Sequence, residues 1–218
     1  NMAASCYIGE SACYRVAKDI EDRIEYFISK GMSDQEAELK GVEDFAVECS
    51  LIKVGASEDI QNCADEGIQI FGGMGFSADT PMESAWRDAR IGRIYEGTNE
   101  INRMLSVGML LKKGMKGQID LMAAVMQAAS SINNNEEEIK GDKLIEEQKL
   151  IYKFKQIFLV LLGNCVQKYG AKLENHQQIL LCLSDILIET YFSESGLLRT
   201  LKNINRTSYE LQKTQTDI

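Results

Sequence analysis

One carboxylate stands where an enzyme could use it as a base. Glu96 lies between Tyr95 and Gly97, in a short turn expected between two helical segments. A side chain on such a turn can reach into a pocket, and general-base catalysis requires a carboxylate within reach of the proton that it removes. A Glu at a helix boundary is more often solvated or a helix cap. The turn by itself therefore predicts only a candidate base.

A glycine-rich segment precedes this turn. The residues from Gln69 to Gly73 read Gln-Ile-Phe-Gly-Gly, and Gly75 follows them. Glycine lets the backbone approach a ligand closely, and the Gln side chain could serve a nucleotide phosphate. The segment lacks the G-x-G-x-x-G fingerprint and no strand is expected before it, which excludes a Rossmann site. On composition alone it is more typical of a helix terminator.

Together the two segments resemble the acyl-CoA dehydrogenase family. The resemblance lies in Gln69 to Phe76 and in the run from Trp86 to Arg103, and it covers about the first half of the chain. It implies FAD-dependent α,β-dehydrogenation of acyl-CoA thioesters to enoyl-CoA, as in fatty acid β-oxidation. The implied partners are an acyl-CoA substrate, electron-transfer flavoprotein as electron acceptor, and further copies of the chain in a homodimer or homotetramer. An acyl-CoA oxidase and a helical assembly module without activity are the two alternatives.

The resemblance also implies a role for each site residue. Glu96 would be the catalytic base that removes the proton next to the thioester carbonyl, and its backbone N–H would help to polarise that carbonyl. Tyr95 and Gly97 would contact the substrate. Two groups would contact FAD: Gln69, Ile70, Phe71, Gly72 and Gly73, which would face the cofactor of a neighbouring subunit, and Thr98, Asn99 and Glu100.

Composition predicts an all-α protein. The chain has 218 residues, 44% of them hydrophobic, and a single proline, Pro81, within long stretches of good helix formers. The formal net charge of −9 argues against a nucleic-acid partner. Six cysteines form no CxxC pair and His176 is the only histidine, so a metal site is not expected. The longest apolar run, 157–162, is far shorter than the roughly 20 residues of a membrane span.

Full-length members of the family carry a helical domain and a β-sheet domain ahead of the part that this sequence resembles. The resemblance implies that most of the acyl-chain pocket, and any targeting peptide, belong to that preceding part. No signal is visible in this chain, and the expected compartment is the bacterial cytoplasm or the mitochondrial matrix.

Capping residues and the single proline in the sequence predict the helix boundaries. Helices are expected over about 3–29, from a capping box at Ser33 and Glu36 to about residue 55, and from a cap at Ser57 to 70. Thr80 and Pro81 should open a further helix that runs to about Tyr95. The next helix should start at a Thr98 cap and extend toward residue 116.

The second half resembles the extra helical segment that long-chain-type members of the family carry after the core, and it is expected to form an extra helical hairpin domain. We predict a carboxy-terminal-like acyl-CoA dehydrogenase bundle over 1–127, a linker over the Asn- and Glu-rich residues 128–142, and a helical extension over 143–218. Helices are expected over about 143–169 and 176–206. Residues 191–204 match residues 7–20 at six of fourteen positions. This match indicates either a duplicated helical hairpin or two amphipathic helices that converged on similar residues.

Overall fold

The structure is a computed structural model that describes residues 1–131 and 143–204. Every regular element in these two ranges is a helix, which confirms the all-α prediction. The helices are α1 (Met2–Ser29), α2 (Asp34–Asp44), α3 (Ala46–Phe71), α4 (Gly73–Phe76), α5 (Pro81–Ile91), α6 (Asn99–Met115), α7 (Leu121–Ser131), α8 (Ile145–Tyr169), the 3-10 helix η1 (Gly170–Asn175) and α9 (Gln177–Ile204). Within the described ranges, no helix is both long and apolar enough to cross a membrane.

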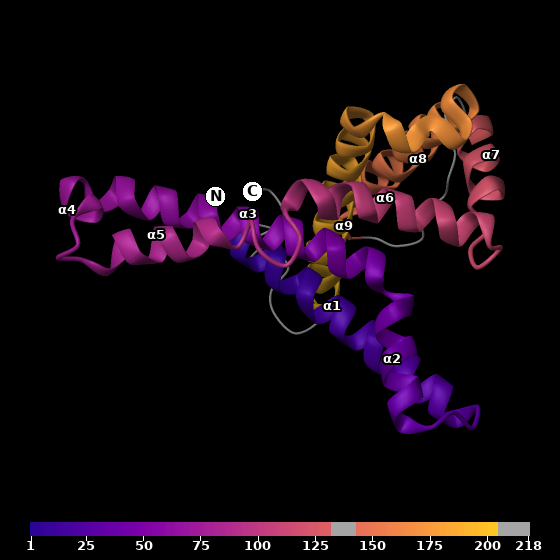
Figure 1. Cartoon of the computed structure of the whole chain (residues 1–218), viewed down its shortest axis with the longest axis horizontal. Coiled ribbons are helices and arrows are strands. Elements are labelled where there is room, and N and C mark those ends of the chain that lie inside the picture. Colours follow the sequence, from indigo (N-terminus) through magenta and orange to yellow (C-terminus); the bar gives the residue numbers. More distant parts are fainter. Residues whose placement is uncertain (132–142, 205–218) are drawn as a thin grey trace.

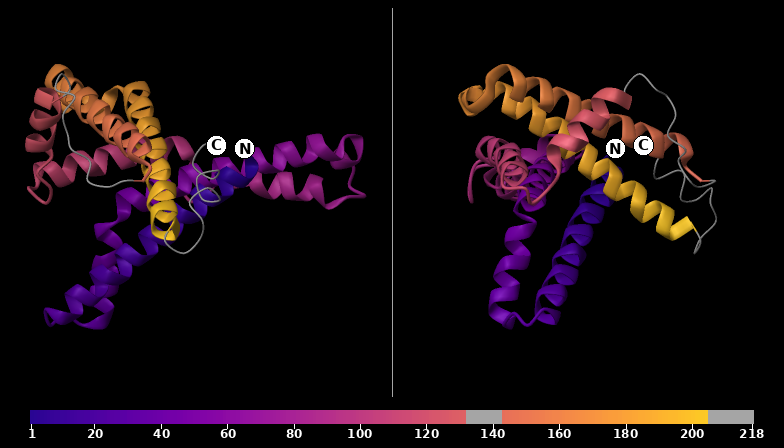
Figure 2. Two further views of the ribbon diagram at one scale, coloured as in Figure 1. Left: turned by 180° about the vertical axis from the view of Figure 1, so that it is seen from behind. Right: turned by 90° about the vertical axis from the view of Figure 1, so that its right-hand side faces the viewer.

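Two helical arms project from a central body. One arm is formed by the second half of α3 with α4 and α5, and the other by the end of α1 with α2 (Figure 1). The body contains α6, α7, α8 and α9, and α9 crosses it beside α1, α3 and α6 (Figure 2). The turn that carries Glu96 lies between α5 and α6, where the first arm joins the body.

Helix α9 contributes to all three hydrophobic clusters of the described residues. Ile188 and Phe192 of α9 pack with Ala12 of α1 and Leu51 of α3. Other α9 residues pack with α6, α8 and η1 in a second cluster and with α8 in a third. The described parts of the two halves therefore share a hydrophobic core. Residues 132–142 of the expected linker lie outside the described residues, and the division into two domains stays a prediction.

Three of the expected boundaries are wrong. The second helix ends at Asp44 instead of near residue 55, and α3 then runs without a break through Ser57, which was expected to be a cap. The Ser57 hydroxyl donates to the carbonyl of Val54 one turn earlier, so it is accommodated inside the helix. Helix α5 ends at Ile91 instead of near Tyr95, and the residues after it form the turn that bears Glu96.

Three expected helix starts are confirmed. Ser33, Thr80 and Thr98 occupy the N-cap positions of α2, α5 and α6. Of these three, the Thr98 side chain alone caps a backbone N–H, that of Ile101 at 3.3 Å. The Ser33 hydroxyl donates to the carboxylate of Glu36, and the Thr80 hydroxyl donates to the carbonyl of Met74.

The sequence match between residues 7–20 and 191–204 has a structural counterpart, because these segments of α1 and α9 pack against each other. Arg15 of α1 forms an ion pair with Glu194 at 3.0 Å and lies over the ring of Tyr191 at 4.8 Å.

The same contacts recur with the two helices exchanged. Arg199 of α9, which matches Arg15, forms an ion pair with Glu10 and lies 4.4 Å over the ring of Tyr7. Each Arg also donates to the serine of the opposite helix, Ser195 or Ser11. The matched residues thus form a locally two-fold symmetric helix pair within one chain.

Candidate active site on the turn between α5 and α6

The turn that carries Glu96 has an unusual backbone. Glu96 has φ 54° and Gly97 has φ 83°, both in the left-handed region. This region costs a residue other than glycine about 1 to 2 kcal/mol, so a Glu held there needs support from its surroundings. The Asn99 N–H closes the turn by donating to the carbonyl of Arg93 at 3.1 Å. The strained residue is the one that the sequence singled out as a base.

Two side chains hold the turn at the Gly97 carbonyl. Lys53 of α3 donates from Nζ to this oxygen at 2.7 Å, and Asn102 of α6 donates to it from Nδ2 at 2.9 Å. The Asn102 amide also donates to the carbonyl of Thr98 at 3.2 Å. A Cβ atom on Gly97 would lie 3.0 Å from Asn102 Nδ2, so glycine suits this position both for its φ and for the close approach.

Asn99 supports the turn from inside. Its side chain is fully buried, and its Oδ1 accepts from Lys53 Nζ at 2.8 Å. Its Nδ2 donates to Ser57 at 3.0 Å and to Glu58 at 3.1 Å. Both polar atoms of the Asn99 side chain are therefore hydrogen-bonded within the chain. A flavin contact at this residue would have to come from its backbone.

A charged network lies behind this amide. Arg103 of α6 contacts both carboxylate oxygens of Glu58 at 2.8 Å and donates to Asp185 of α9 at 2.6 Å. Burial acts to raise the pKa of Glu58, but hydrogen bonds from Arg103 and Asn99 and the nearby positive charges outweigh burial and hold the pKa below its usual value. The network ties α3, α6 and α9 together at the base of the turn.

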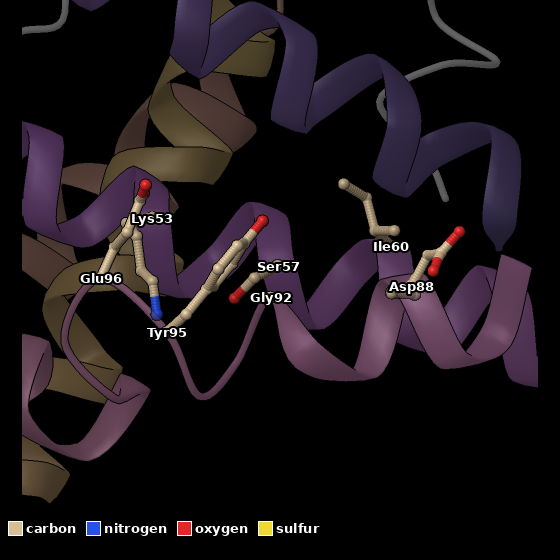
Figure 3. Close-up of a pocket in the computed structure, with 8 residues that line it drawn as sticks. Lys53, Ser57, Ile60, Asp88, Gly92, Tyr95 and Glu96 are labelled. Carbon is tan, nitrogen blue, oxygen red and sulfur yellow. The ribbon is translucent and has the colours of Figure 1, made fainter.

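A small cavity opens in front of the turn. It has a volume of about 220 Å³ and is lined by residues of α3, α5 and the turn: Lys53, Ser57, Ile60, Asp88, Ala89, Gly92, Tyr95 and Glu96. Figure 3 shows Lys53, Tyr95 and Glu96 grouped at one end, with Ile60 and Asp88 at the other. Tyr95 and Glu96 are exposed at the cavity. A drug-sized ligand needs about 300 to 1,000 Å³, so an acyl-CoA bound here would extend beyond these walls.

Sequence reasoning missed the support that α3 provides. Lys53 and Ser57 are spaced by four residues and so share one helix face. That spacing was available in the sequence, but nothing in it indicated that this face meets the Glu96 turn. Only the packing of α3 against α5 and α6 brings residues 44 positions apart, Lys53 and Gly97, into hydrogen-bonding distance.

The glycine-rich segment lies away from the Glu96 turn. Gln69 to Gly73 are at the far tip of the α3–α5 arm, where α3 gives way to α4 (Figure 1). Helix α3 rises about 1.5 Å per residue, which places Phe71 about 27 Å along the helix from Lys53. All five residues are exposed, with Ile70 68% and Phe71 51% accessible. The structure does not bring the two expected cofactor-contacting groups together within one chain.

The remaining expected contacts lie at the start of α6. The Thr98 hydroxyl caps this helix, while the side chain of Glu100 is exposed in its first turn. Hydrogen bonds from its own backbone N–H and from the Thr98 hydroxyl lower the pKa of Glu100. Among the described residues, no group of three or more His, Cys, Asp or Glu side chains could hold a metal ion.

Comparison with known proteins identifies relatives of this chain. Residues 1–110 match the family described as "Acyl-CoA dehydrogenase, C-terminal domain", and residues 153–217 match a second family with the same description. A probable acyl-CoA dehydrogenase of Bacillus subtilis (strain 168) is 39% identical over 204 residues, which are 93% of this chain and 34% of that protein. The very long-chain specific mitochondrial enzyme of Bos taurus is 39% identical over 103 residues, 47% of this chain and 13% of that protein.

A solved structure shows the same fold. The crystal structure of an acyl-CoA dehydrogenase complexed with FAD from Bacillus anthracis superimposes with a TM-score of 0.91 at 38% identity, covering 98% of this chain and 37% of that chain. This chain thus spans about a third of the length of the two Bacillus relatives. The family match over half of the chain and the agreement in fold show that the chain belongs to the acyl-CoA dehydrogenase family.

Proposed function

We propose that this chain forms the carboxy-terminal, base-bearing part of an FAD-dependent acyl-CoA dehydrogenase that converts acyl-CoA thioesters to enoyl-CoA in fatty acid β-oxidation. The observation that carries the proposal is the position of Glu96. Glu96 lines a cavity and lies on a left-handed turn that Lys53 and Asn102 hold in place. Backbone strain that is supported in this way is typical of functional sites.

In this proposal Glu96 is the general base. Its carboxylate takes the proton from the carbon next to the thioester carbonyl, and its backbone N–H donates to the carbonyl oxygen, where negative charge develops. Tyr95 lies beside it at the cavity. Gly97 has no side chain to obstruct the thioester. Bound FAD would supply the two-electron oxidation at the adjacent carbon.

The residues of the arm tip suit contact with a flavin nucleotide. A Cβ atom on Gly72 or Gly73 would meet no atom within 4 Å, so a ligand can reach the backbone there. Gln69 offers an amide, and Ile70 and Phe71 offer exposed apolar surface. The long separation from Glu96 supports a role for these five residues on the FAD of a neighbouring subunit, while Thr98 and Glu100 would contact a cofactor beside the base. The relative from Bacillus anthracis is complexed with FAD.

The test replaces the base in a protein that also carries the amino-terminal region of the relatives. Glu96→Gln should retain FAD and bind acyl-CoA but reduce the rate of flavin bleaching by roughly 10²- to 10⁴-fold under anaerobic conditions, because an amide cannot accept the proton. Glu21→Gln, on the exposed face of α1, is the matched control and should bleach at the unchanged rate. Near-normal bleaching in Glu96→Gln would place the base elsewhere.

Two further measurements separate the alternatives. An assembly module without activity would hold no flavin and show no bleaching in the unmodified protein. Rapid reoxidation by oxygen with release of hydrogen peroxide would indicate an acyl-CoA oxidase, whereas a dehydrogenase should need an electron-transfer flavoprotein or an artificial acceptor.

A further inference from the structure

Lys53 is the one described cation with a hydrogen bond to the turn of the proposed base. Its Nζ donates to the Gly97 carbonyl at 2.7 Å and to Asn99 Oδ1 at 2.8 Å, so one ammonium group contacts both the strained turn and the first residue of α6. It also lines the same cavity as Glu96 (Figure 3). A hydrogen bond from a charged donor to a carbonyl is stronger and shorter than one between neutral groups.

The surroundings of Lys53 are acidic. Glu58 of α3, Asp88 of α5, Glu96 of the turn and Glu100 of α6 face it or share its cavity. Burial lowers the pKa of Lys53, and the charges of Glu100, Glu96 and Glu58 act in the opposite direction. Glu58 is already bound by Arg103, and Glu100 is hydrogen-bonded at the start of α6. The Lys53 ammonium is thus held between these acidic groups and the Gly97 carbonyl of the turn.

We propose that Lys53 is a positioning residue for Glu96: through the Gly97 carbonyl it holds the left-handed turn, and with it the Glu96 side chain, in place. This inference rests on the proposed function of Glu96 as base. It assigns Lys53 no contact with substrate or cofactor. The inference therefore has two separable consequences, a loss of rate without the Lys53 donor and unchanged substrate binding.

The first consequence concerns rate. Lys53→Met keeps an unbranched side chain of similar length but removes the donor and the charge. We expect flavin reduction by acyl-CoA to slow by roughly 10- to 100-fold, because a small displacement of a catalytic group has an effect of this size. FAD content should stay close to that of the unmodified protein, and the melting temperature should fall by only about 2 to 4 °C, since two hydrogen bonds are lost. Lys53→Arg, which keeps the charge and donors, should recover most of the rate.

The second consequence concerns substrate binding. Because Lys53 is assigned no contact with the substrate, the acyl-CoA concentration that gives half-maximal flavin reduction in Lys53→Met should stay within roughly twofold of that in the unmodified protein. Lys112→Met, which removes an exposed lysine of α6 away from the turn, should change neither this concentration nor the rate. If Lys53→Met does not fold, Lys53→Gln, which also lacks the ammonium group, provides the same two readouts.

The experiment is anaerobic stopped-flow reduction of the flavin over a range of acyl-CoA concentrations, in the protein that also carries the amino-terminal region of the relatives. Glu96→Gln is run beside the Lys53 variants. An unchanged rate in Lys53→Met, with Glu96→Gln inactive, would overturn the inference and leave the proposed function intact. Equal rate losses in the Met and Arg variants would also overturn it, and so would a large rise in the half-maximal acyl-CoA concentration, which would indicate a substrate contact. Activity in Glu96→Gln would instead refute the proposed base.

Discussion

At the scale of single residues, the site depends on a few backbone and side-chain contacts around Gly97. Its φ of 83° lies in a region that other residues occupy only at a cost, and its carbonyl receives hydrogen bonds from Lys53 and Asn102. Gly97 therefore contributes to the stability of the fold as well as to the proposed catalysis. The cost of the positive φ can be separated from the cost of crowding Asn102 by a comparison with Gly117. Gly117 lies just after the end of α6 and has a similar φ of 68°, but open space where a Cβ atom would lie.

Gly97→Ala should therefore destabilise the protein more than Gly117→Ala. The control carries only the backbone cost of about 1 kcal/mol. At Gly97 the added Cβ would also crowd Asn102 Nδ2 at 3.0 Å and weaken its hydrogen bonds, which should bring the loss to about 2 kcal/mol. Chemical denaturation of both variants provides the measurement. Equal losses would show that the Asn102 contact contributes nothing.

At the scale of helices, the symmetric pairing of α1 and α9 exposes one difference between the two helices. The Tyr7 hydroxyl is hydrogen-bonded to Thr200 at 3.1 Å, whereas the Tyr191 hydroxyl is buried without a partner among the described residues. The residue of α1 that matches Thr200 is Val16, which cannot form a hydrogen bond through its side chain. Burial also raises the pKa of Tyr191. The symmetry thus indicates which substitution would supply the missing partner.

Val16→Thr should stabilise the chain by about 1 kcal/mol, because its hydroxyl would pair with that of Tyr191 as Thr200 pairs with Tyr7. Val54→Thr is the matched control: Val54 is fully buried in the same region, where a new hydroxyl should cost about 1 to 2 kcal/mol. The test is the free energy of unfolding of each of the two variants, compared with that of the unmodified protein. A loss at Val16 as large as that at Val54 would show that the two-fold relation does not extend to this pair.

At the scale of the whole molecule, the α3–α5 arm ends in apolar surface that the described chain does not cover. Phe71, Met74 and Phe76 are 51%, 52% and 78% accessible at its tip. This exposure is what a homodimer or homotetramer would remove, and it coincides with the glycine-rich segment proposed to contact the FAD of another subunit. Assembly and cofactor retention should then depend on the same few residues.

Gly73→Val tests this coupling more cleanly than a change at Gly72, whose φ of 61° would itself penalise a side chain. Gly73 has no positive φ and no atom within 4 Å of an added Cβ, so the arm should fold normally. A valine side chain should keep the nucleotide from the backbone and lower FAD content and oligomer mass together. Sedimentation velocity and the flavin absorbance of the purified protein measure both. If the variant keeps its full FAD content and its oligomer mass, the arm tip does not contact the flavin nucleotide.

The sequence by itself determined the helical class, the family and the candidate base, because these depend on local patterns. Helix-forming composition, the N-cap positions Thr80 and Thr98 and the run around Glu96 are properties of contiguous residues. The internal match between α1 and α9 was also visible, although its meaning as a helix pair was not.

Only the tertiary structure decided which distant residues support the turn. Gly55 and Ser57 suggested a helix boundary, yet packing overrides this local signal: the ring of Phe192 lies against Gly55, and the Ser57 hydroxyl is satisfied inside α3. Likewise, the sequence offered Asn99 as a cofactor contact, and only the burial of its side chain against Lys53 shows that this side chain supports the turn. Such roles depend on contacts between residues far apart in the chain, and local propensity carries no information about which helix faces will meet.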